Sequence, residues 1–251
     1  MSKLLLEMKN IDKSFFNVKI LDNVNFNLYP GEVHALVGEN GAGKSSLMKI
    51  MMGIYKRDAG TILLDGEEVN FHNPREALSA GIAMIPQELN PILDMQVAEY
   101  LFIGREITKT NMGGVSIVDH KAQIEQTKKL FESTGVDINP RVLMRNLSVA
   151  HIQLVEIIKA ISLDAKIVIM DEPTSAITFK EVETLFEQIR KLKTQEVGIV
   201  YISHKMEEIT QIADRVTVLR DGKWIGTDDA QNYSHDKIIQ MMVGREIEDI
   251  Y

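Results

Sequence analysis

The stretch that decides the fold lies at residues 38–45 and reads Gly38-Glu39-Asn40-Gly41-Ala42-Gly43-Lys44-Ser45. It matches the pattern of a phosphate-binding loop, in which glycines let the backbone curl so that successive N–H groups point at a polyphosphate. Lys44 is placed to neutralise the outer phosphates and Ser45 to ligate magnesium, and Ser46 completes the predicted contacts. The motif therefore predicts a site for a nucleoside triphosphate with Mg²⁺.

The sequence on both sides of the loop agrees with this prediction. Residues 32–37 are rich in β-forming side chains and predict a strand that leads into the loop. Beyond the loop, Leu47, Ile50 and Met51 recur at helical spacing, and Gly53 offers a helix stop. The order of strand, loop and helix is the one that a phosphate loop requires, so we set aside a chance match.

Composition argues against several classes of protein. The net charge of -8 disfavours a nucleic-acid surface, which needs clustered positive charge. The absence of cysteine removes disulfides, thiolate zinc sites and cysteine nucleophiles. No apolar run approaches the roughly 18 residues of a membrane span, and the first residues do not form a signal peptide. We expect a soluble, unsecreted protein that is still able to dock against a membrane partner.

The spacing of apolar residues predicts how the chain is organised. Alternating Val24, Phe26 and Leu28 indicate a strand with one buried face, and Asp65-Gly66 and Asp221-Gly222 predict antiparallel hairpins. The middle of the chain is helical in pattern. Residues 97–103 and 119–132 predict helices, a loose stretch at 108–116 lies between them, and we expect an inserted helical lobe at about 88–146 within a core of 1–87 and 147–251.

After this lobe, strands and helices alternate. Residues 167–170 form an unbroken apolar run, as expected for a parallel strand buried on both faces, and residues 198–203 predict the next strand. The fold class predicted is α/β, a mostly parallel, doubly wound sheet with an antiparallel β subdomain and an inserted helical subdomain. The helix between the two strands has its apolar face at Val182, Leu185, Phe186, Ile189 and Leu192.

Polar residues follow three of the predicted strands. Asp171, directly after a buried strand, is placed to hold magnesium, and Glu172 to polarise an attacking water. His204 closes the strand predicted at 198–203, where it could contact the γ-phosphate. Gln87 closes a strand predicted at 82–85, where it could sense that phosphate through magnesium or water. Taken alone, an Asp-Glu pair is usually a polar loop entry, and a histidine or glutamine there is usually an ordinary hydrogen-bonding residue. The local sequence is likewise accounted for if Ser148 is simply the N-cap of a helix. A helix N-terminus also offers free amides to a phosphate, so a binding role stays open.

With these positions in order, the chain resembles the nucleotide-binding domain of the ATP-binding cassette transporters over nearly its whole length. The resemblance implies a P-loop ATPase that binds ATP and Mg²⁺, with Ser45, Gln87 and Asp171 as metal ligands and Glu172, His204 and Lys44 in catalysis. It also implies that Phe15 stacks on adenine, with Phe16 as the alternative. The ordered matches are the phosphate loop, Gln87, Leu147-Ser148, Asp171-Glu172-Pro173-Thr174-Ser175 and His204.

The nearest subfamily by resemblance is that of the ribose- and galactoside-type sugar importers, which carry two cassettes in tandem. It implies a permease in the membrane, a second cassette, a sugar-binding protein outside the cell, and a peripheral place on the cytoplasmic face. The chain would then be the leading cassette, as a truncated tandem protein or a free single cassette. The motifs are G-E-N-G-A-G-K-S-S, I-P-Q-E-L at 85–89, L-F-I-G-R-E at 101–106, V-E-I-I-K-A at 155–160, and M-V-G-R-E at 242–246.

The chain departs from the family at two motifs. In the signature L-S-G-G-Q both glycines and the glutamine are replaced, while the leucine and serine are kept. S-A-L-D is replaced by Ser175-Ala176-Ile177-Thr178, which lacks the acidic residue. Side chains in place of the two signature glycines should crowd a γ-phosphate. We therefore hypothesise an asymmetric pair, in which this chain's loop forms the competent half-site and its signature faces a weaker one. The signature residues are Leu147, Ser148, Val149, Ala150 and His151.

Two rival functions stay open at this point. One is a soluble, non-transport cassette that acts in DNA repair or on ribosomes; the lack of cysteine zinc modules and of long coiled coils argues against two such types. The other is a cassette that holds ATP as a clamp without hydrolysing it. Glu172 and His204 argue against the clamp.

Overall fold

The computed structural model describes residues 3–110, 116–175 and 177–244. Ala176 and residues 245–246, which belong to two of the motifs above, lie outside the described residues. The chain divides into two compact units, one of residues 1–86, 165–173 and 189–251 and the other of residues 87–164 and 174–188. Within the described ranges, no helix is long and apolar enough to cross a membrane.

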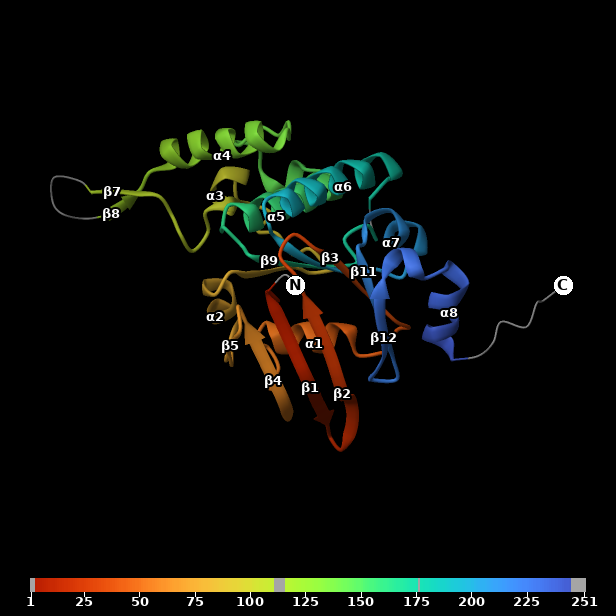
Figure 1. Ribbon diagram of the computed structural model, residues 1–251. Helices are drawn as coiled ribbons and strands as arrows, with labels where there is room; N and C mark the ends of the chain where they lie inside the picture. Colours follow the sequence, from red (N-terminus) through yellow and green to blue (C-terminus); the bar gives the residue numbers. More distant parts are fainter. Residues whose placement is uncertain (1–2, 111–115, 176, 245–251) are drawn as a thin grey trace. The chain divides into compact units, whose positions relative to one another are not determined.

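The first unit is built on one ten-stranded sheet, counted over the described residues (Figure 1). Its strands are β1 (Leu6–Phe15), β2 (Val18–Leu28), β3 (Val33–Val37), β4 (Ala59–Leu64), β5 (Glu67–Glu68), β6 (Ile82–Ile85), β9 (Ile167–Asp171), β10 (Gly198–Ile202), β11 (Arg215–Arg220) and β12 (Lys223–Asp229). They lie in the order β5-β4-β1-β2-β12-β11-β3-β10-β9-β6.

Strand directions divide this sheet into two parts. From β11 through β3, β10 and β9 to β6, every pair is parallel. β1 pairs antiparallel with β2 and β4, and β12 joins the parts by pairing antiparallel with β11 and parallel with β2. The predicted α/β fold with a parallel core and an antiparallel part is confirmed.

The described residues of the first unit contain α1 (Lys44–Met51), α2 (Pro74–Ser79), α7 (Met206–Ile212), α8 (His235–Val243) and a 3-10 turn at Ala230–Asn232, together with the end of α6 (Phe179–Thr194) from Ile189. β9 and β10 are buried at every residue, as their apolar composition requires. Leu47, Met48 and Met51 of α1 are 0% exposed and lie in one core with Leu36 and Val200. The phosphate loop is thus held between a buried strand and a buried helix.

Both predicted hairpin turns are present. Asp65 and Gly66 have φ of 53° and 87°, and Asp221 and Gly222 have φ of 51° and 74°. Two consecutive positive φ values are the geometry of the tight turn that suits twisted antiparallel strands.

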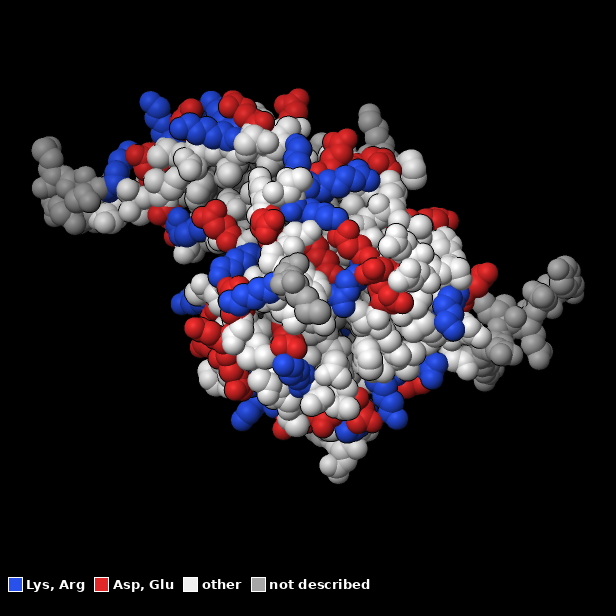
Figure 2. Space-filling model, viewed as in Figure 1, with Lys and Arg blue, Asp and Glu red and all other residues white. Residues whose placement is uncertain are grey.

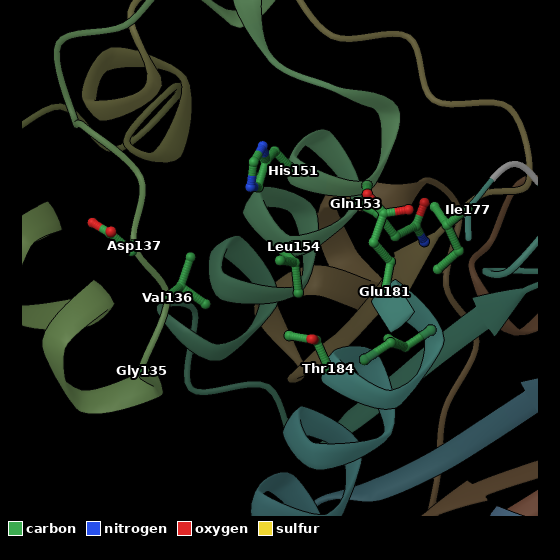
Figure 3. Close-up of a pocket in the computed structure, with 11 residues that line it drawn as sticks. Gly135, Val136, Asp137, His151, Gln153, Leu154, Ile177, Glu181 and Thr184 are labelled. Carbon is green, nitrogen blue, oxygen red and sulfur yellow. The ribbon is translucent and has the colours of Figure 1, made fainter. Parts of the chain in front are cut away.

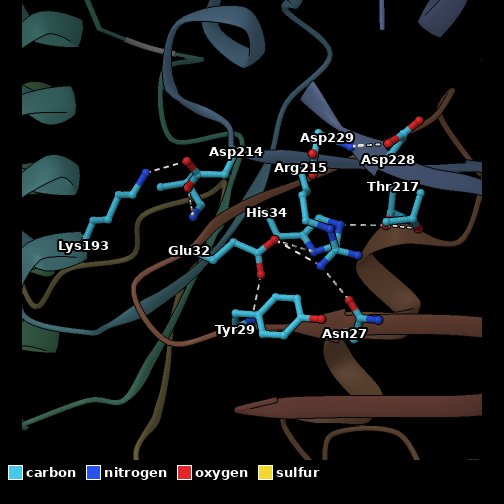
Figure 4. A network of polar contacts seen from close by, with 12 residues as sticks. Asn27, Tyr29, Glu32, His34, Lys193, Asp214, Arg215, Thr217, Asp228 and Asp229 are labelled. Atoms are coloured by element: carbon cyan, nitrogen blue, oxygen red, sulfur yellow. Dashed lines mark hydrogen bonds and ion pairs between the residues drawn. The ribbon is translucent and has the colours of Figure 1, made fainter. Parts of the chain in front are cut away.

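A buried polar network ties β3 to β2 and β11 (Figure 4). Arg215 Nη1 donates to Asn27 Oδ1 at 2.8 Å and to Glu32 Oε1 at 3.2 Å, while His34 Nε2 lies 2.7 Å from Thr217 Oγ1. Burial, helped by the positive charge of Arg215, lowers the pKa of His34 to about 3, and burial raises the pKa of Glu32. The network fixes the strand that leads into the phosphate loop.

The second unit is mainly helical. It contains α3 (Val97–Leu101), α4 (His120–Thr134), a 3-10 turn at Met144–Asn146, α5 (Val149–Ile161) and the part of α6 (Phe179–Thr194) up to Gln188. Val97 of α3, Phe131 of α4 and Val155 and Ile158 of α5 share one core. Because α5 packs into this core, the second unit reaches beyond the lobe predicted at 88–146, to residue 164, and also includes residues 174–188.

One expectation for this unit was wrong. The stretch 108–116 is not loose at its ends, because β7 (Thr108–Thr110) pairs antiparallel with β8 (Ser116–Val118). Three-residue strands are too short to show a period of two, so only their β-branched residues signalled them. Residues 111–115 lie outside the described residues.

Charged side chains of both signs are interspersed over the face drawn in Figure 2.

Candidate nucleotide site

The backbone of residues 38–45 adopts conformations that favour glycine. Gly41 and Gly43 have φ of 86° and 101°, and a Cβ on Gly38 would lie 2.4 Å from the carbonyl oxygen of Leu219. Gly43 is the N-cap of α1 and supplies no side-chain hydrogen bond to it. The first N–H groups of α1 therefore have no partner within the helix, which is the arrangement that binds anions.

The β11–β12 turn completes this loop, a role that its sequence did not reveal. Gly222 N–H donates to the Ala42 carbonyl at 3.2 Å, and a Cβ on Gly222 would lie 2.4 Å from the Ile20 carbonyl. The hairpin predicted at Asp221-Gly222 thus packs against the phosphate loop.

Lys44 carries the positive charge of the loop. It is 7% exposed, and its Nζ donates to the carbonyl oxygens of Gly38 at 2.7 Å and Glu39 at 3.0 Å. Burial lowers its pKa, and the nearby carboxylates of Glu172 and Asp171 oppose that shift. The ammonium is therefore held inside the loop, where an arriving phosphate would meet it.

Ser45 and Asp171 form a pair of hard oxygen donors beside Lys44. Ser45 Oγ donates to Asp171 Oδ2 at 3.4 Å, and Asp171 is 8% exposed. Burial raises the pKa of Asp171, although the Ser45 hydrogen bond acts in the opposite direction. Within the described ranges no three His, Asp or Glu residues cluster as a metal site. One hydroxyl and one carboxylate fit Mg²⁺, which binds through few protein ligands together with waters and substrate phosphates.

Glu172 and His204 meet next to this pair. Glu172 has a φ of 46°, its N–H donates to the Ile202 carbonyl at 2.9 Å, and its Oε1 lies 3.1 Å from His204 Nδ1. Positive φ in a residue other than glycine is uncommon and is often found at functional sites. The Glu172 side chain is 14% exposed and that of His204 is 59% exposed, so the imidazole is the more accessible group.

Of the two candidate adenine-stacking residues, only one is supported by neighbours. Phe15 ends β1 and is partly buried, with its ring centroid 5.0 Å from that of Tyr55. Phe16, the next residue, is 101% exposed and has a φ of 47°.

The remaining predicted residues belong to the second unit. Gln87 is its first residue and is exposed. Ser148 caps α5, since its Oγ accepts from the His151 N–H at 3.2 Å. The signature residues thus form the N-terminus of α5, with Ser148 as its N-cap, as the local sequence predicted.

The two side chains that replace the signature glycines differ in exposure. Ala150 is 5% exposed and is among the residues that line a pocket within the second unit, which Figure 3 draws. Val149 is 48% exposed. The crowding of a γ-phosphate by these side chains stays a prediction, for which the exposed Val149 is better placed than the buried Ala150.

The segment after Ser175 contains a helix start that the sequence analysis missed. Thr178 donates through its N–H and its Oγ1 to Glu181 Oε2, both at 2.7 Å. Thr178 and Glu181 have the threonine-x-x-glutamate spacing of a capping box, so the signal was present.

Comparison with known proteins gives a consistent result. A family model described as "ABC transporter" matches residues 21–175. The chain is 55% identical over 243 residues to the galactose/methyl galactoside import ATP-binding protein of Sodalis glossinidius, a match that covers 97% of this chain and 47% of that protein. It is 53% identical over 251 residues to a protein of the same description from Photobacterium profundum, covering 100% of this chain and 50% of that one.

The chain therefore spans about half the length of the curated relatives it matches. Among solved structures, the ADP conformation of MJ1267, an ATP-binding cassette of an ABC transporter, aligns with a TM-score of 0.82 and 25% identity, covering 96% of this chain and 99% of that one. A sequence match over most of the chain and a shared fold lead to one assignment: the chain belongs to the ABC transporter family.

Proposed function

We propose that the chain binds and hydrolyses ATP as one cassette of a carbohydrate importer. The observation that carries this proposal is the grouping of Lys44, the Ser45–Asp171 pair and the Glu172–His204 pair around one glycine loop in the first unit. Lys44 would supply charge neutralisation, the Ser45–Asp171 pair metal binding, and the Glu172–His204 pair the positioning of water.

In this proposal, water attacks the γ-phosphorus in line while the loop N–H groups and Lys44 hold the phosphates. Glu172 orients the water and accepts its proton, and His204 holds the Glu172 carboxylate and contacts the γ-phosphate. Ser45 and Asp171 would hold Mg²⁺, which would supply positive charge against the phosphate oxygens. Gln87, in the second unit, stays a candidate ligand by resemblance alone. No covalent intermediate with the protein is needed.

The transport role rests on the names of the relatives, which are import ATP-binding proteins for galactose and methyl galactoside. We propose that the chain works with a second cassette and a membrane permease, fed by a sugar-binding protein. It would lie peripherally on the cytoplasmic face, and closure of two cassettes around ATP would drive the permease.

We further propose that the pair of cassettes is asymmetric. The exposed Val149 at the start of α5 replaces a glycine of the signature and would narrow the approach of a γ-phosphate there. The chain's own glycine loop has no such change. By itself the chain should bind ATP but hydrolyse it slowly, because its loop lacks a partner signature.

Sugar-dependent ATP hydrolysis tests this function. The chain, a second cassette and the permease would be reconstituted in liposomes with the galactose-binding protein, and phosphate release measured with and without galactose. We expect release to rise with galactose in the complex and to stay low in a verified monomer. High hydrolysis by the monomer would contradict the claim that the loop needs the signature of a partner cassette. No hydrolysis by the complex would contradict the proposed function.

A further inference from the structure

The ring of Phe15 is held from two sides at the end of β1. Tyr55 meets it edge to face, with centroids 5.0 Å apart and an interplanar angle of 72°. Lys13 Nζ lies 4.9 Å from the ring centroid. Both contacts are of the kinds that stabilise an aromatic ring in one orientation.

Asp58 fixes the backbone that carries this ring. Its carboxylate accepts from Lys13 Nζ at 2.9 Å and from Ser14 N–H at 2.6 Å, and its own N–H donates to the Asp12 carbonyl at 2.9 Å. These hydrogen bonds, the one from Lys13 first, lower the pKa of Asp58. One carboxylate thus anchors the two residues that precede Phe15.

Tyr55 connects the ring to the helix that begins at the phosphate loop. The N–H groups of Ile54 and Tyr55 donate to the Lys49 carbonyl in the last turn of α1, at 2.8 and 3.1 Å. Lys49 Nζ also lies 5.4 Å from the Tyr55 ring centroid. The support of Phe15 is therefore built on α1 itself.

The pairing of β1 with β2 places Phe15 near the end of the phosphate loop. Phe15 pairs with Val18, two residues before Ile20, and the Ile20 carbonyl is 3.1 Å from the place of a Cβ on Gly43. Two residues of strand and one strand spacing place Phe15 roughly 10 Å from the end of the loop.

We propose that Asp58 and Tyr55 are positioning residues that hold Phe15 as the platform for the adenine base, and so set the base-dependent part of the affinity for ATP. The inference rests on the proposed function. A ring held before the ligand arrives loses little entropy on binding, whereas the 101% exposed Phe16 would have to be ordered first. Stacking on Phe15 adds to the phosphate contacts and does not alter them.

Two ligands separate this role from a general structural one. Calorimetry would measure the Kd of Mg-ATP and of Mg-tripolyphosphate, which has the phosphates but no base, for the 251-residue chain and its variants. The variants are Asp58→Asn and Tyr55→Leu, with Tyr55→Phe as the conservative change. Asp65→Asn is the matched control, because Asp65 also accepts from a lysine, Lys166 at 2.6 Å, but lies at the β4–β5 turn.

We expect Asp58→Asn and Tyr55→Leu to weaken Mg-ATP binding about three- to tenfold, because each would lose part of the binding free energy of one stacked base. Mg-tripolyphosphate binding should change less than about twofold, since Lys44 and the loop are intact. Tyr55→Phe and Asp65→Asn should match the unchanged chain for both ligands, and circular dichroism would verify folding.

Equal weakening for both ligands, or no change for either, would overturn the inference while leaving the nucleotide site in place. If the unchanged chain binds neither ligand, the proposed function fails and the inference fails with it.

Discussion

Substituting single glycines of the phosphate loop tests whether its shape is enforced by neighbours. Gly38→Ala would place a Cβ 2.4 Å from the Leu219 carbonyl oxygen and 2.9 Å from the Ala42 Cβ. Gly41→Ala would place a Cβ with no atom within 4 Å, although its φ of 86° disfavours any side chain. Gly41→Ala therefore tests backbone strain alone, whereas Gly38→Ala, with a φ of 158°, adds a steric clash to it.

The expected magnitudes follow from these contacts. Gly41→Ala should cost about 1–3 kcal/mol of unfolding free energy, the range for a residue in a sparsely populated conformation. Gly38→Ala should cost about 1–3 kcal/mol from overpacking alone, because β11, which carries Leu219, is held by strands on both sides and cannot yield. The loop must move instead, by roughly 1 Å to restore an ordinary contact distance.

That movement would reach Lys44, because the Gly38 carbonyl accepts from its Nζ at 2.7 Å. We expect Gly38→Ala to weaken Mg-ATP binding by at least about tenfold, equivalent to 1.4 kcal/mol, and by more than Gly41→Ala does. Urea unfolding would measure stability and calorimetry the Kd. Near-normal binding by Gly38→Ala, with weak binding by Gly41→Ala, would refute the reasoning.

Three further changes test the chemistry and the core. Glu172→Gln should keep Mg-ATP binding but lower hydrolysis by the assembled transporter about 10²- to 10⁴-fold; equal loss in the surface control Glu187→Gln would reject the role of Glu172. Asp171→Asn should weaken ATP binding in the presence of Mg²⁺ and leave binding in EDTA unchanged; equal loss in both would argue against metal binding.

His34 binds a proton in the unfolded chain near pH 6.5, but its folded pKa is about 3, so stability should fall as the pH drops from 6.5, by at most about 1.4 kcal/mol per pH unit. In His34→Gln, the urea-unfolding midpoint should depend less on pH between pH 7 and 5 than in the unchanged chain. An equal dependence of the midpoint on pH in both proteins would contradict this.

The sequence predicted the parallel core well because the signals there are local. The apolar run at 167–170 and the glycine loop each specify one geometry, whatever lies around them. Asp171 and Glu172 were placed at a strand end by the same reasoning. The two Asp-Gly turns were equally clear, since few other sequences adopt two positive φ values in succession.

What the sequence did not predict depends on contacts between distant segments. The packing of Gly222 against Ala42 joins residues far apart in the chain, and neither residue signals it. The burial of Ala150 depends on which face of α5 is covered, and the short β7 and β8 strands lacked a readable period. The helix start at Thr178 and Glu181 differs from these cases, because its capping-box spacing was present in the sequence and could have predicted it.

The measurement that tests the central claim most directly is a calorimetric titration of Mg-ATP into the folded chain and into Lys44→Ala. The account predicts a saturable heat with one site per chain, and a Kd at least about tenfold weaker for Lys44→Ala, since a buried ammonium that meets phosphate is lost. Absence of any binding heat in the folded, unsubstituted chain, or equal binding by both proteins, would contradict it.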